Sequence, residues 1–196
     1  MASRSPRRRD ILNQLKIPFI IHEVDIDESI KFKKYIIPSV IDISRKKAEE
    51  AGRFYKNGLV LGVDTVVFFQ KKVFGKPKDA EEAYRFIRQL SGNKHTVISG
   101  ITILDSANGK SRSLVASTEV YFYKLEEWEI RQYIEQNEWV DKAGGYAIQG
   151  RGAAFIKKIE GSFHNVMGLP VGELFILLKK FDYFNKNGEY RPVRKL

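Results

Sequence analysis

Cysteine is absent from this sequence, and none of its apolar runs is long enough to cross a membrane. Without cysteine the chain can form no disulfide, no zinc–thiolate site and no cysteine nucleophile, and such a composition fits a reducing cytoplasm. A membrane helix needs roughly 20 apolar residues, which no segment here approaches. The N-terminus is polar and basic with no apolar core behind it, so it lacks the pattern of a signal peptide. We therefore expect a cytoplasmic protein without a membrane partner.

The chain has 196 residues, of which 43% are hydrophobic and 30% charged, a balance typical of a globular protein with a sizeable core. Its net charge of +10 favours anionic partners such as nucleotides, nucleic acid or anionic lipid. Much of this excess could instead serve solubility, because basic residues gather near the C-terminus. We expect one domain over residues 1–182, followed by a disordered or loosely docked basic tail over residues 183–196.

Helical and strand periodicities alternate irregularly along the chain, without an internal repeat. They predict helices over Ser39–Tyr55, from an Asp79 cap to Leu90, over Glu126–Gln136 and over Val171–Phe181, and strands over Pro18–Val24, Leu59–Phe69, His95–Leu104, Ser113–Tyr123 and Ala153–Ile159. Two long antiparallel strands fall late in this order. The pattern predicts a mixed α/β fold, in which a twisted mixed sheet is flanked by helices and a central cleft separates two lobes.

Asp64 stands out because it lies inside an apolar stretch, between the runs LVLGV and VVFF. An ionised carboxylate is costly in such a strand unless a cation reaches it, so a residue that breaks the pattern is a candidate site residue. The alternative is that the strand ends at Val63 and that Asp64 is an ordinary turn residue. A hairpin through Gln70–Lys72 could bring Lys76 back toward Asp64.

The N-terminal segment carries a second irregularity. Ser5 is a good helix N-cap, and Pro6 suits the first helical position. The first turn then holds Arg7, Arg8 and Arg9, although the helix dipole favours acidic side chains there. A bound phosphate would satisfy both the free N–H groups and the guanidinium groups, which predicts an anion site. A solvated basic N-terminus is the alternative.

Two further segments complete the set of candidates. Asp25, Asp27 and Glu28 form an acidic cluster that could hold magnesium or manganese, or could be solvated loop charges. The glycine-rich segment Asp141–Gly152 could let its backbone approach a ligand, and its Gln149 could read a base edge; a plain flexible loop is the alternative. The sequence has no Walker A motif. Together these residues predict metal-assisted hydrolysis of a phosphoanhydride.

Several motifs, taken together in their order and spacing, resemble the Maf family of nucleoside triphosphate pyrophosphatases. They are Ser-x-Ser-Pro-Arg-Arg at Ser3–Arg8, Lys47-Ala48, Gly62-Val63-Asp64-Thr65-Val66-Val67, Gly75-Lys76-Pro77, Leu90-Ser91-Gly92, DKAGGYAIQG at Asp141–Gly150, and Gly161-Ser162 with Gly168-Leu169-Pro170. The resemblance runs from Ser3 to about Phe181, nearly the whole chain. Several motifs in register are a more specific signal than any one of them.

The resemblance implies hydrolysis of a nucleoside triphosphate to the monophosphate and pyrophosphate, with a divalent cation (Mg²⁺ or Mn²⁺), in a homodimer. It implies that Asp64 is the proton acceptor that activates water and, with Glu28, a metal ligand. The substrate-binding positions that it implies are Ser5, Arg7, Arg8, Lys47, Thr65, Lys76 and Gln149.

Arg7, Thr65 and Gln149 resemble the determinants of the branch of this family that prefers dTTP and UTP. The resemblance thus implies dTTP and UTP as substrates, modified pyrimidine nucleotides as further candidates, and a role in nucleotide-pool cleansing; the family is also associated with cell division arrest. One alternative is a 7-methyl-GTP pyrophosphatase of the same family. The other is a nucleic-acid-binding regulatory protein, which we disfavour because the sequence lacks a basic stripe interleaved with aromatic residues.

Overall fold

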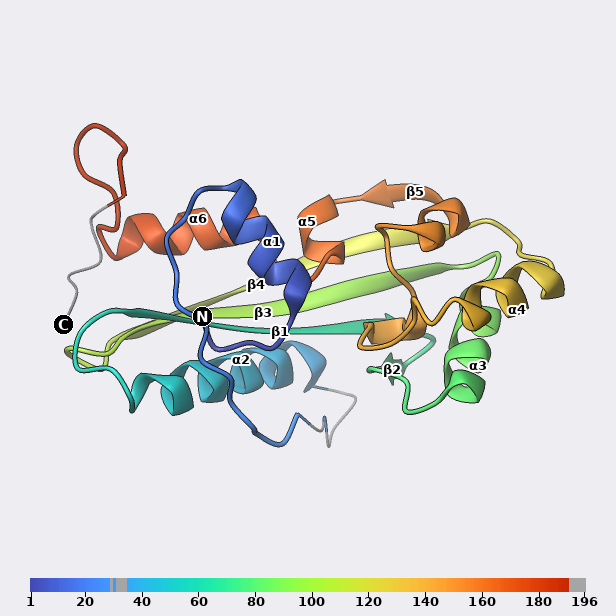
Figure 1. Cartoon of the computed structure of the whole chain (residues 1–196), viewed down its shortest axis with the longest axis horizontal. Coiled ribbons are helices and arrows are strands. Elements are labelled where there is room, and N and C mark those ends of the chain that lie inside the picture. The colour runs from blue at the N-terminus through green and yellow to red at the C-terminus, as the bar shows by residue number, and fades with distance from the viewer. Residues whose placement is uncertain (29, 31–34, 191–196) are drawn as a thin grey trace.

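The computed structural model describes residues 1–28, 30 and 35–190 of the chain. Its centre is a five-stranded antiparallel sheet in the order β2-β1-β3-β4-β5 (Figure 1). The strands are β1 (Leu59–Phe69), β2 (Lys72–Phe74), β3 (Lys94–Asp105), β4 (Ser111–Phe122) and β5 (Ile156–Glu160). The helices are α1 (Pro6–Gln14), α2 (Ile36–Gly52), α3 (Ala80–Leu90), α4 (Glu127–Glu135), α5 (Phe163–Val166) and α6 (Val171–Lys180), with 3-10 turns η2 (Ala143–Gly145) and η3 (Arg151–Phe155).

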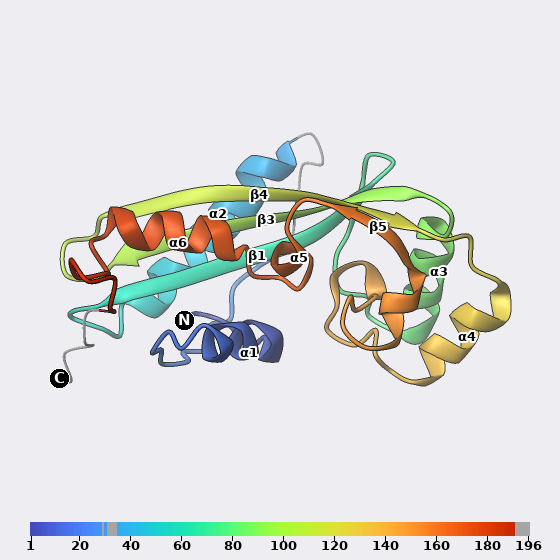
Figure 2. The same cartoon turned by 90° about the horizontal axis from the view of Figure 1, so that it is seen from above.

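Helices cover both faces of the long strands, as Figure 2 shows from above. On one face, α1 and α6 pack against β1 and β3 through a buried apolar cluster that includes Ile11, Leu12, Val63, Ile101 and Leu174. On the other face, α2 lies along β1 and β3. Because β1 is buried on both faces, its sequence is apolar on both sides of Asp64 and Thr65 instead of alternating, and the predicted strand Leu59–Phe69 is confirmed. The predicted class, a mixed α/β fold with a helix-flanked sheet, is confirmed as well. The sheet itself is antiparallel and not mixed as predicted, because β1–β2 and β3–β4 are hairpins and the pairs β1–β3 and β4–β5 also run antiparallel.

Two glycines allow α2 to lie directly on the sheet. A Cβ atom at Gly62 would stand 2.0 Å from the carbonyl oxygen of Ser44, and one at Gly100 would stand 2.3 Å from that of Val40. No side chain larger than hydrogen fits at such distances. This close contact brings Lys47, one turn beyond Ser44 on α2, within reach of the middle of β1.

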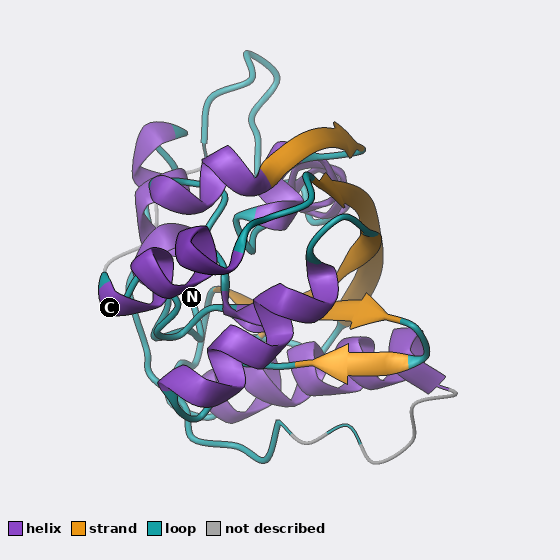
Figure 3. Ribbon diagram, turned by 90° about the vertical axis from the view of Figure 1, so that its right-hand side faces the viewer, coloured by secondary structure: helices purple, strands orange, loops and turns teal. Residues whose placement is uncertain are grey.

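A second core fills the other end of the sheet, where α3, α4 and η2 gather; Figure 1 labels both helices, and this end faces the viewer in Figure 3. Its members include Ile87, Leu90, Phe122, Ile130 and Tyr133. Asp79 begins α3 as predicted, because its Oδ1 accepts a hydrogen bond of 2.7 Å from the backbone N–H of Glu82. The two larger buried cores, at the two ends of one sheet, correspond to the two predicted lobes, and two smaller clusters form where α2 packs.

Several predicted boundaries are wrong. Pro18–Val24 is not a strand: within it only His22 forms a β-bridge, to Ala2, which also bridges Gly62. The helix predicted over Ser39–Tyr55 is α2, which begins and ends three residues earlier. The strand predicted over Ala153–Ile159 starts later, because η3 occupies its first residues. No helix within the described ranges is long and apolar enough to span a membrane.

The described part of the predicted tail, residues 183–190, packs against the domain. Tyr183, Phe184 and Tyr190 contact the same apolar cluster as α1 and α6. The Tyr190 hydroxyl donates a hydrogen bond of 2.8 Å to the carbonyl oxygen of Leu15. The remainder of that tail, residues 191–196, lies outside the described residues.

Candidate active site

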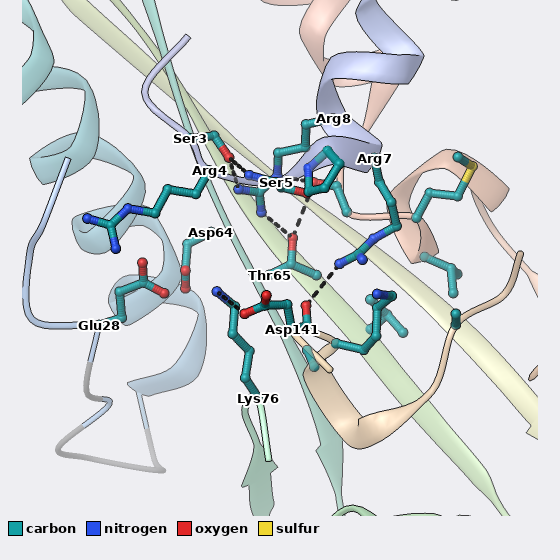
Figure 4. A pocket seen from close by; sticks show the side chains of 18 of the residues that line it. Ser3, Arg4, Ser5, Arg7, Arg8, Glu28, Asp64, Thr65, Lys76 and Asp141 are labelled. Atoms are coloured by element: carbon teal, nitrogen blue, oxygen red, sulfur yellow. Dashed lines mark hydrogen bonds and ion pairs between the residues drawn. The ribbon is translucent and has the colours of Figure 1, made fainter. Parts of the chain in front are cut away.

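A cavity of about 360 Å³ lies between the two cores, at one edge of β1 (Figure 4). The residues that line it come from the N-terminal segment and α1, the loop before α2, α2 itself, β1, the segment after β2, the glycine-rich loop and the segment after α5. The site residues expected from the sequence that line it are Ser5, Arg7, Arg8, Glu28, Lys47, Asp64, Thr65 and Lys76. The structure thus brings together eight of the nine, from segments far apart in the sequence.

The edge of β1 explains how two neighbouring residues can both reach this cavity. One edge of β1 pairs with β3 from Leu59 to Phe68. On the other edge, Ala2 bridges Gly62 and β2 pairs with β1 only from Val67 to Phe69, which leaves a gap between them in the described structure. Consecutive strand residues point to opposite faces. At this gap Asp64 can therefore face the α2 side of the cavity while Thr65 faces the α1 side.

Lys47 supplies the positive charge that stabilises the buried Asp64 carboxylate. Its ammonium donates to Asp64 Oδ1 at 2.9 Å and to the carbonyl oxygen of Val63 at 3.3 Å, and it pairs with Glu28 Oε1 at 2.9 Å. These three partners account for all three donors of the ammonium group. Lys47 and Asp64 are 6% and 5% exposed, so neither charge could be kept there without the other. Among the described residues, Asp64 Oδ2 has no such contact and remains available to a water molecule.

Glu28 lies at the mouth of the same cavity and shares Lys47 with Asp64. Partial burial works to raise the pKa of Glu28, but the charge and hydrogen bond of Lys47 outweigh it and hold that pKa below its usual range. The side chain is 46% exposed. Glu28 is therefore an ionised carboxylate at neutral pH, within reach of solvent and of a ligand.

Arg8 ties four segments of the chain together. Its Nε donates to the carbonyl oxygen of Gly168 at 2.7 Å, its Nη1 to Ser3 Oγ at 3.0 Å, and its Nη2 to Thr65 Oγ1 at 3.2 Å. Burial lowers the pKa of Arg8 to about 10, which leaves it charged at neutral pH. A guanidinium has five N–H donors, so two are left for a ligand in the cavity. Arg8 is thus a structural cross-link as well as a cationic wall of the cavity.

Asp141 contacts two cationic side chains that line the cavity, those of Arg7 and Lys76. Its backbone carbonyl accepts a hydrogen bond of 3.1 Å from Arg7 Nη2, and its carboxylate lies 3.8 Å from Lys76 Nζ. Figure 4 shows Arg7 and Lys76 pointing toward this residue from different elements. The predicted hairpin does return Lys76 to the cavity that holds Asp64. Both cations are half-buried or exposed and can turn toward an anion.

The glycine-rich loop is anchored from behind and is not a plain solvated linker. The backbone N–H of Ala147 donates to the Tyr133 hydroxyl at 3.0 Å, and the Tyr146 hydroxyl lies 2.7 Å from His95 Nε2. Tyr146 and Ala147 line the cavity, but Gln149 is exposed and does not line it. The expected role of Gln149 in reading a base therefore stays a prediction.

The donor set around Asp64 suits a divalent cation that is held mainly through a substrate. Two carboxylates, of Asp64 and Glu28, converge on one point, the ammonium of Lys47. No group of three or more candidate ligands exists among the described residues. Mg²⁺ usually keeps several waters and is bound by one or two carboxylates plus substrate phosphates, so this pair fits such an ion.

Four residues that the structure places at the site are not among those expected from the sequence. Ser3 and Gly168 accept hydrogen bonds from Arg8, and the backbone carbonyl of Asp141 accepts one from Arg7. The fourth is Ser99, whose hydroxyl lies 2.9 Å from Thr65 Oγ1. Two of them act through backbone carbonyls, which every residue has, so no residue-type signal marks them. Ser99 sits in an apolar strand, and its interruption of the pattern is the same kind of signal that revealed Asp64.

Comparisons with known proteins agree with this geometry. A family model described as Maf-like protein matches residues 1–181. The dTTP/UTP pyrophosphatase of Pelotomaculum thermopropionicum is 44% identical over 183 residues, which are 93% of this chain and 96% of the relative. That of Carboxydothermus hydrogenoformans is 40% identical, over 93% of this chain and 98% of the relative. That of Methanosarcina barkeri is also 40% identical, over 92% of each. With the family model covering nearly every described residue and relatives aligned over almost their full length, this chain belongs to the Maf family.

Proposed function

We propose that this protein hydrolyses dTTP and UTP to the nucleoside monophosphate and pyrophosphate. The observation that carries the proposal is the buried Asp64 carboxylate, which lies in one cavity with the cations of Arg7, Arg8, Lys47 and Lys76. A triphosphate is complementary to such a wall of positive charge. The names of the relatives, dTTP/UTP pyrophosphatases, support the same reaction and the same nucleotides.

In the proposed step, the Asp64 carboxylate accepts a proton from a water molecule through Oδ2. The water oxygen forms a bond to the α-phosphorus, while the bond from that phosphorus to the bridging oxygen breaks and pyrophosphate leaves with the electron pair. Lys47 keeps Oδ1 of Asp64 fixed, so the carboxylate is oriented before the substrate arrives. The remaining N–H donors of Arg8 stabilise the negative charge that develops on the phosphate oxygens.

A divalent cation, Mg²⁺ or Mn²⁺, is part of the proposal. When bound, such a cation neutralises phosphate charge and polarises both the phosphoryl group and a bound water. Glu28 and Asp64 are the residues that would hold it. Lys47 contacts both carboxylates, so it keeps them close together when no cation is bound.

Arg7, Thr65 and Gln149 support pyrimidine substrates through their resemblance to the dTTP- and UTP-preferring branch. Modified pyrimidine nucleotides, nucleotide-pool cleansing and a link to cell division arrest are part of the proposed role. The homodimer and the cytoplasmic location stay predictions. The 7-methyl-GTP reaction is the alternative within the family, and the same assay separates the two.

The test is a panel of nucleoside triphosphates, with pyrophosphate release measured in the presence of Mg²⁺ or Mn²⁺. We expect dTTP and UTP to be the best substrates and Asp64→Asn to lower their turnover by roughly 10²–10⁴-fold, because an amide cannot accept the proton. Removal of the cation with a chelator should have a comparable effect.

A matched control is Asp42→Asn, which changes an exposed carboxylate on α2 that pairs with Arg45 and Lys46. This variant should retain wild-type turnover. If the protein left dTTP and UTP intact but cleaved 7-methyl-GTP, the assignment of the substrate would be wrong. If Asp64→Asn remained fully active, the assignment of the proton acceptor would be wrong.

A further inference from the structure

Arg4 is a cation on the cavity wall to which the proposed mechanism gives no role. It belongs to the segment before α1, and it lines the cavity. Figure 4 shows its side chain on the same side as Glu28 and Asp64, with Arg7 on the far side of Asp64. Its Nε lies 3.3 Å from Glu23 Oε2, and both of these side chains are 62% exposed. Arg4 can therefore reach a ligand in the cavity if this ion pair opens.

The pair with Glu23 is a weak competitor for the Arg4 side chain. Ion pairs between exposed side chains stabilise a protein little, because water screens the two charges. Glu23 lies outside the cavity lining, so the pair holds the guanidinium at the rim. The contact through Nε engages one of its five N–H donors and leaves the others for an anion. A phosphate accepts two parallel hydrogen bonds from arginine and can carry more charge than a carboxylate, so it should displace Glu23.

The side of the cavity that Arg4 faces needs positive charge when a phosphate enters it. Asp64 and Glu28 place two carboxylates there. Lys47 contacts both, but its three N–H donors are already engaged by protein oxygens. In the proposed function, a divalent cation held by these carboxylates would bring phosphate oxygens beside Glu28. Arg4 is the arginine whose side chain extends toward that point in Figure 4.

The orientation of the substrate decides which phosphates lie there. The inference rests on the proposed function, in which Arg7 is among the residues that support a pyrimidine base. The base then lies toward Arg7, and the phosphates run from it past Asp64. Because Figure 4 places Arg4 and Arg7 on opposite sides of Asp64, the phosphates farthest from the base lie toward Arg4.

We propose that Arg4 is a substrate-binding residue which leaves Glu23 and binds the β- and γ-phosphates of the nucleoside triphosphate. Glu23 competes with these phosphates for the same guanidinium. Arg4 thereby favours a triphosphate over a monophosphate, because only the triphosphate carries the groups that it binds. The inference deepens the proposed function by adding a binding position for the pyrophosphate that leaves.

The experiment compares the wild-type protein with Arg4→Ala, using UTP as substrate and each product as an inhibitor. Formation of UMP is followed by chromatography when pyrophosphate is the inhibitor, and release of pyrophosphate is followed when UMP is the inhibitor. We expect the KM for UTP and the inhibition constant of pyrophosphate each to rise about tenfold, since charged hydrogen bonds to phosphate are lost. The inhibition constant of UMP should not change.

Glu23→Gln tests the competition from the other partner. With the carboxylate gone, Arg4 should turn to the phosphates more readily, and the KM for UTP should fall about two- to threefold. In the double variant, Glu23→Gln should have no effect beyond that of Arg4→Ala, because the guanidinium on which it acts is absent. An equal fall in KM with and without Arg4 would show that Glu23 acts by its charge alone, and would overturn the competition.

Arg53→Ala is the matched control. It removes the same charge from another exposed arginine, which pairs with Glu50 at 2.9 Å and lies outside the cavity lining. It should leave the KM for UTP and both inhibition constants unchanged, which separates the loss of a contact from a general loss of positive charge.

The inference and the proposed function can fail separately. If the wild-type protein cleaves UTP but Arg4→Ala changes neither its KM nor the inhibition by pyrophosphate, the inference is wrong and the proposed function stands. A weaker inhibition by UMP, with that by pyrophosphate unchanged, would place Arg4 at the nucleoside end and would also overturn the inference. A wild-type protein that cleaves neither UTP nor dTTP would overturn the proposed function and the inference with it.

Discussion

His95 is a buried side chain that does not line the cavity itself but contacts Tyr146, which does. It is 2% exposed on β3, its Nε2 lies 2.7 Å from the Tyr146 hydroxyl, and its ring packs edge-on against Phe122 and Tyr146. Burial lowers the pKa of His95 to about 4. The folded protein therefore keeps this imidazole neutral, while an unfolded chain binds a proton below a pH of about 6.5.

This difference predicts a loss of stability in mild acid. Because the unfolded state gains a proton first, the free energy of unfolding should fall as the pH drops below about 6.5, and the loss should be complete near the folded pKa of about 4. Between pH 7 and pH 5 the contribution of His95 amounts to about 2 kcal/mol. Urea unfolding at the two pH values measures it in the wild-type protein and in His95→Phe.

In His95→Phe, the change in unfolding free energy between pH 7 and pH 5 should be smaller by about 2 kcal/mol, because phenylalanine cannot bind a proton. This holds whatever the absolute stability of the variant. His164→Phe, which changes a histidine on α5 outside the aromatic cluster, is the matched control and should keep the wild-type difference. A His95→Phe variant with an unchanged difference between pH 7 and pH 5 would show that His95 does not carry the effect.

At the residue scale, the sequence revealed those site residues whose type conflicts with their surroundings. Asp64 was found from its charge within an apolar run, and the structure supplies the reason that it is tolerated, an ion pair with Lys47 from a different element. That pairing could not be derived from the sequence, because it depends on how α2 lies across the sheet. Ser3, Asp141 and Gly168 carry no comparable conflict.

At the scale of elements, the contact between α2 and the sheet decides whether the site forms. Gly62 lies two residues before Asp64 on the same strand, and its missing side chain leaves room for Ser44 and Ala48 of α2. The axial position of Lys47 on α2 then fixes where its ammonium meets Asp64. Any residue that pushes α2 away from β1 should therefore damage both stability and activity.

Gly62→Ala tests this directly. Its Cβ would lie 2.0 Å from the carbonyl oxygen of Ser44, a backbone atom that cannot turn aside, so α2 must shift. We expect the free energy of unfolding to fall by about 3 kcal/mol. Displacing Lys47 from Asp64 by even about 1 Å should also lower kcat/KM by roughly 100-fold. Chemical unfolding and the pyrophosphate assay measure the two effects.

Gly172→Ala is the matched control, because a Cβ there would meet no atom within 4 Å and the residue lies in the first turn of α6. It should be neutral or slightly stabilising, since alanine favours helix over glycine. A stable and fully active Gly62→Ala variant would contradict the account of how α2 positions Lys47.

Elements with a strong local signal were predicted well, and elements defined by their neighbours were not. β1 is confirmed to the residue, and α3 begins after the predicted Asp79 cap. Pro18–Val24 has the composition of a strand but gains only the bridge at His22, because strand pairing needs a partner edge that composition does not provide. The first residues of the strand expected over Ala153–Ile159 instead form η3, which leads from the glycine-rich loop into β5.

At the scale of the whole molecule, the cavity lies between two cores that share one sheet. Helix α1 belongs to the first core, and the glycine-rich loop contributes Tyr146 to the second core and Ile148 to the first. A triphosphate in the cavity would contact both, so the relative position of the two cores matters for binding. The sequence predicts such lobes from the order of elements, but which residues face each other across the cavity depends on the register of β1 with β3.

The C-terminal segment packs aromatic side chains against the first core, in addition to carrying basic residues. The rings of Tyr183, Phe184 and Tyr190 contact one another in edge-on and tilted pairs, and Phe184 stacks against Phe175 of α6. They are partly buried, so each should contribute about 1 kcal/mol or slightly more. By contrast, Arg191, Arg194 and Lys195 contribute charge to the net +10 and lie outside the described residues.

Two truncations separate these contributions. A chain ending at Asp182 lacks the three aromatic residues and should lose about 2–4 kcal/mol of unfolding free energy, because apolar surface on α6 and α1 becomes exposed. A chain ending at Tyr190 keeps them and should be more stable than the chain ending at Asp182 by about this amount. Urea unfolding and the pyrophosphate assay compare the three chains. If the chain ending at Asp182 were as stable as the full-length protein, residues 183–190 would be a loosely docked tail, as the sequence alone predicts, instead of part of the first core.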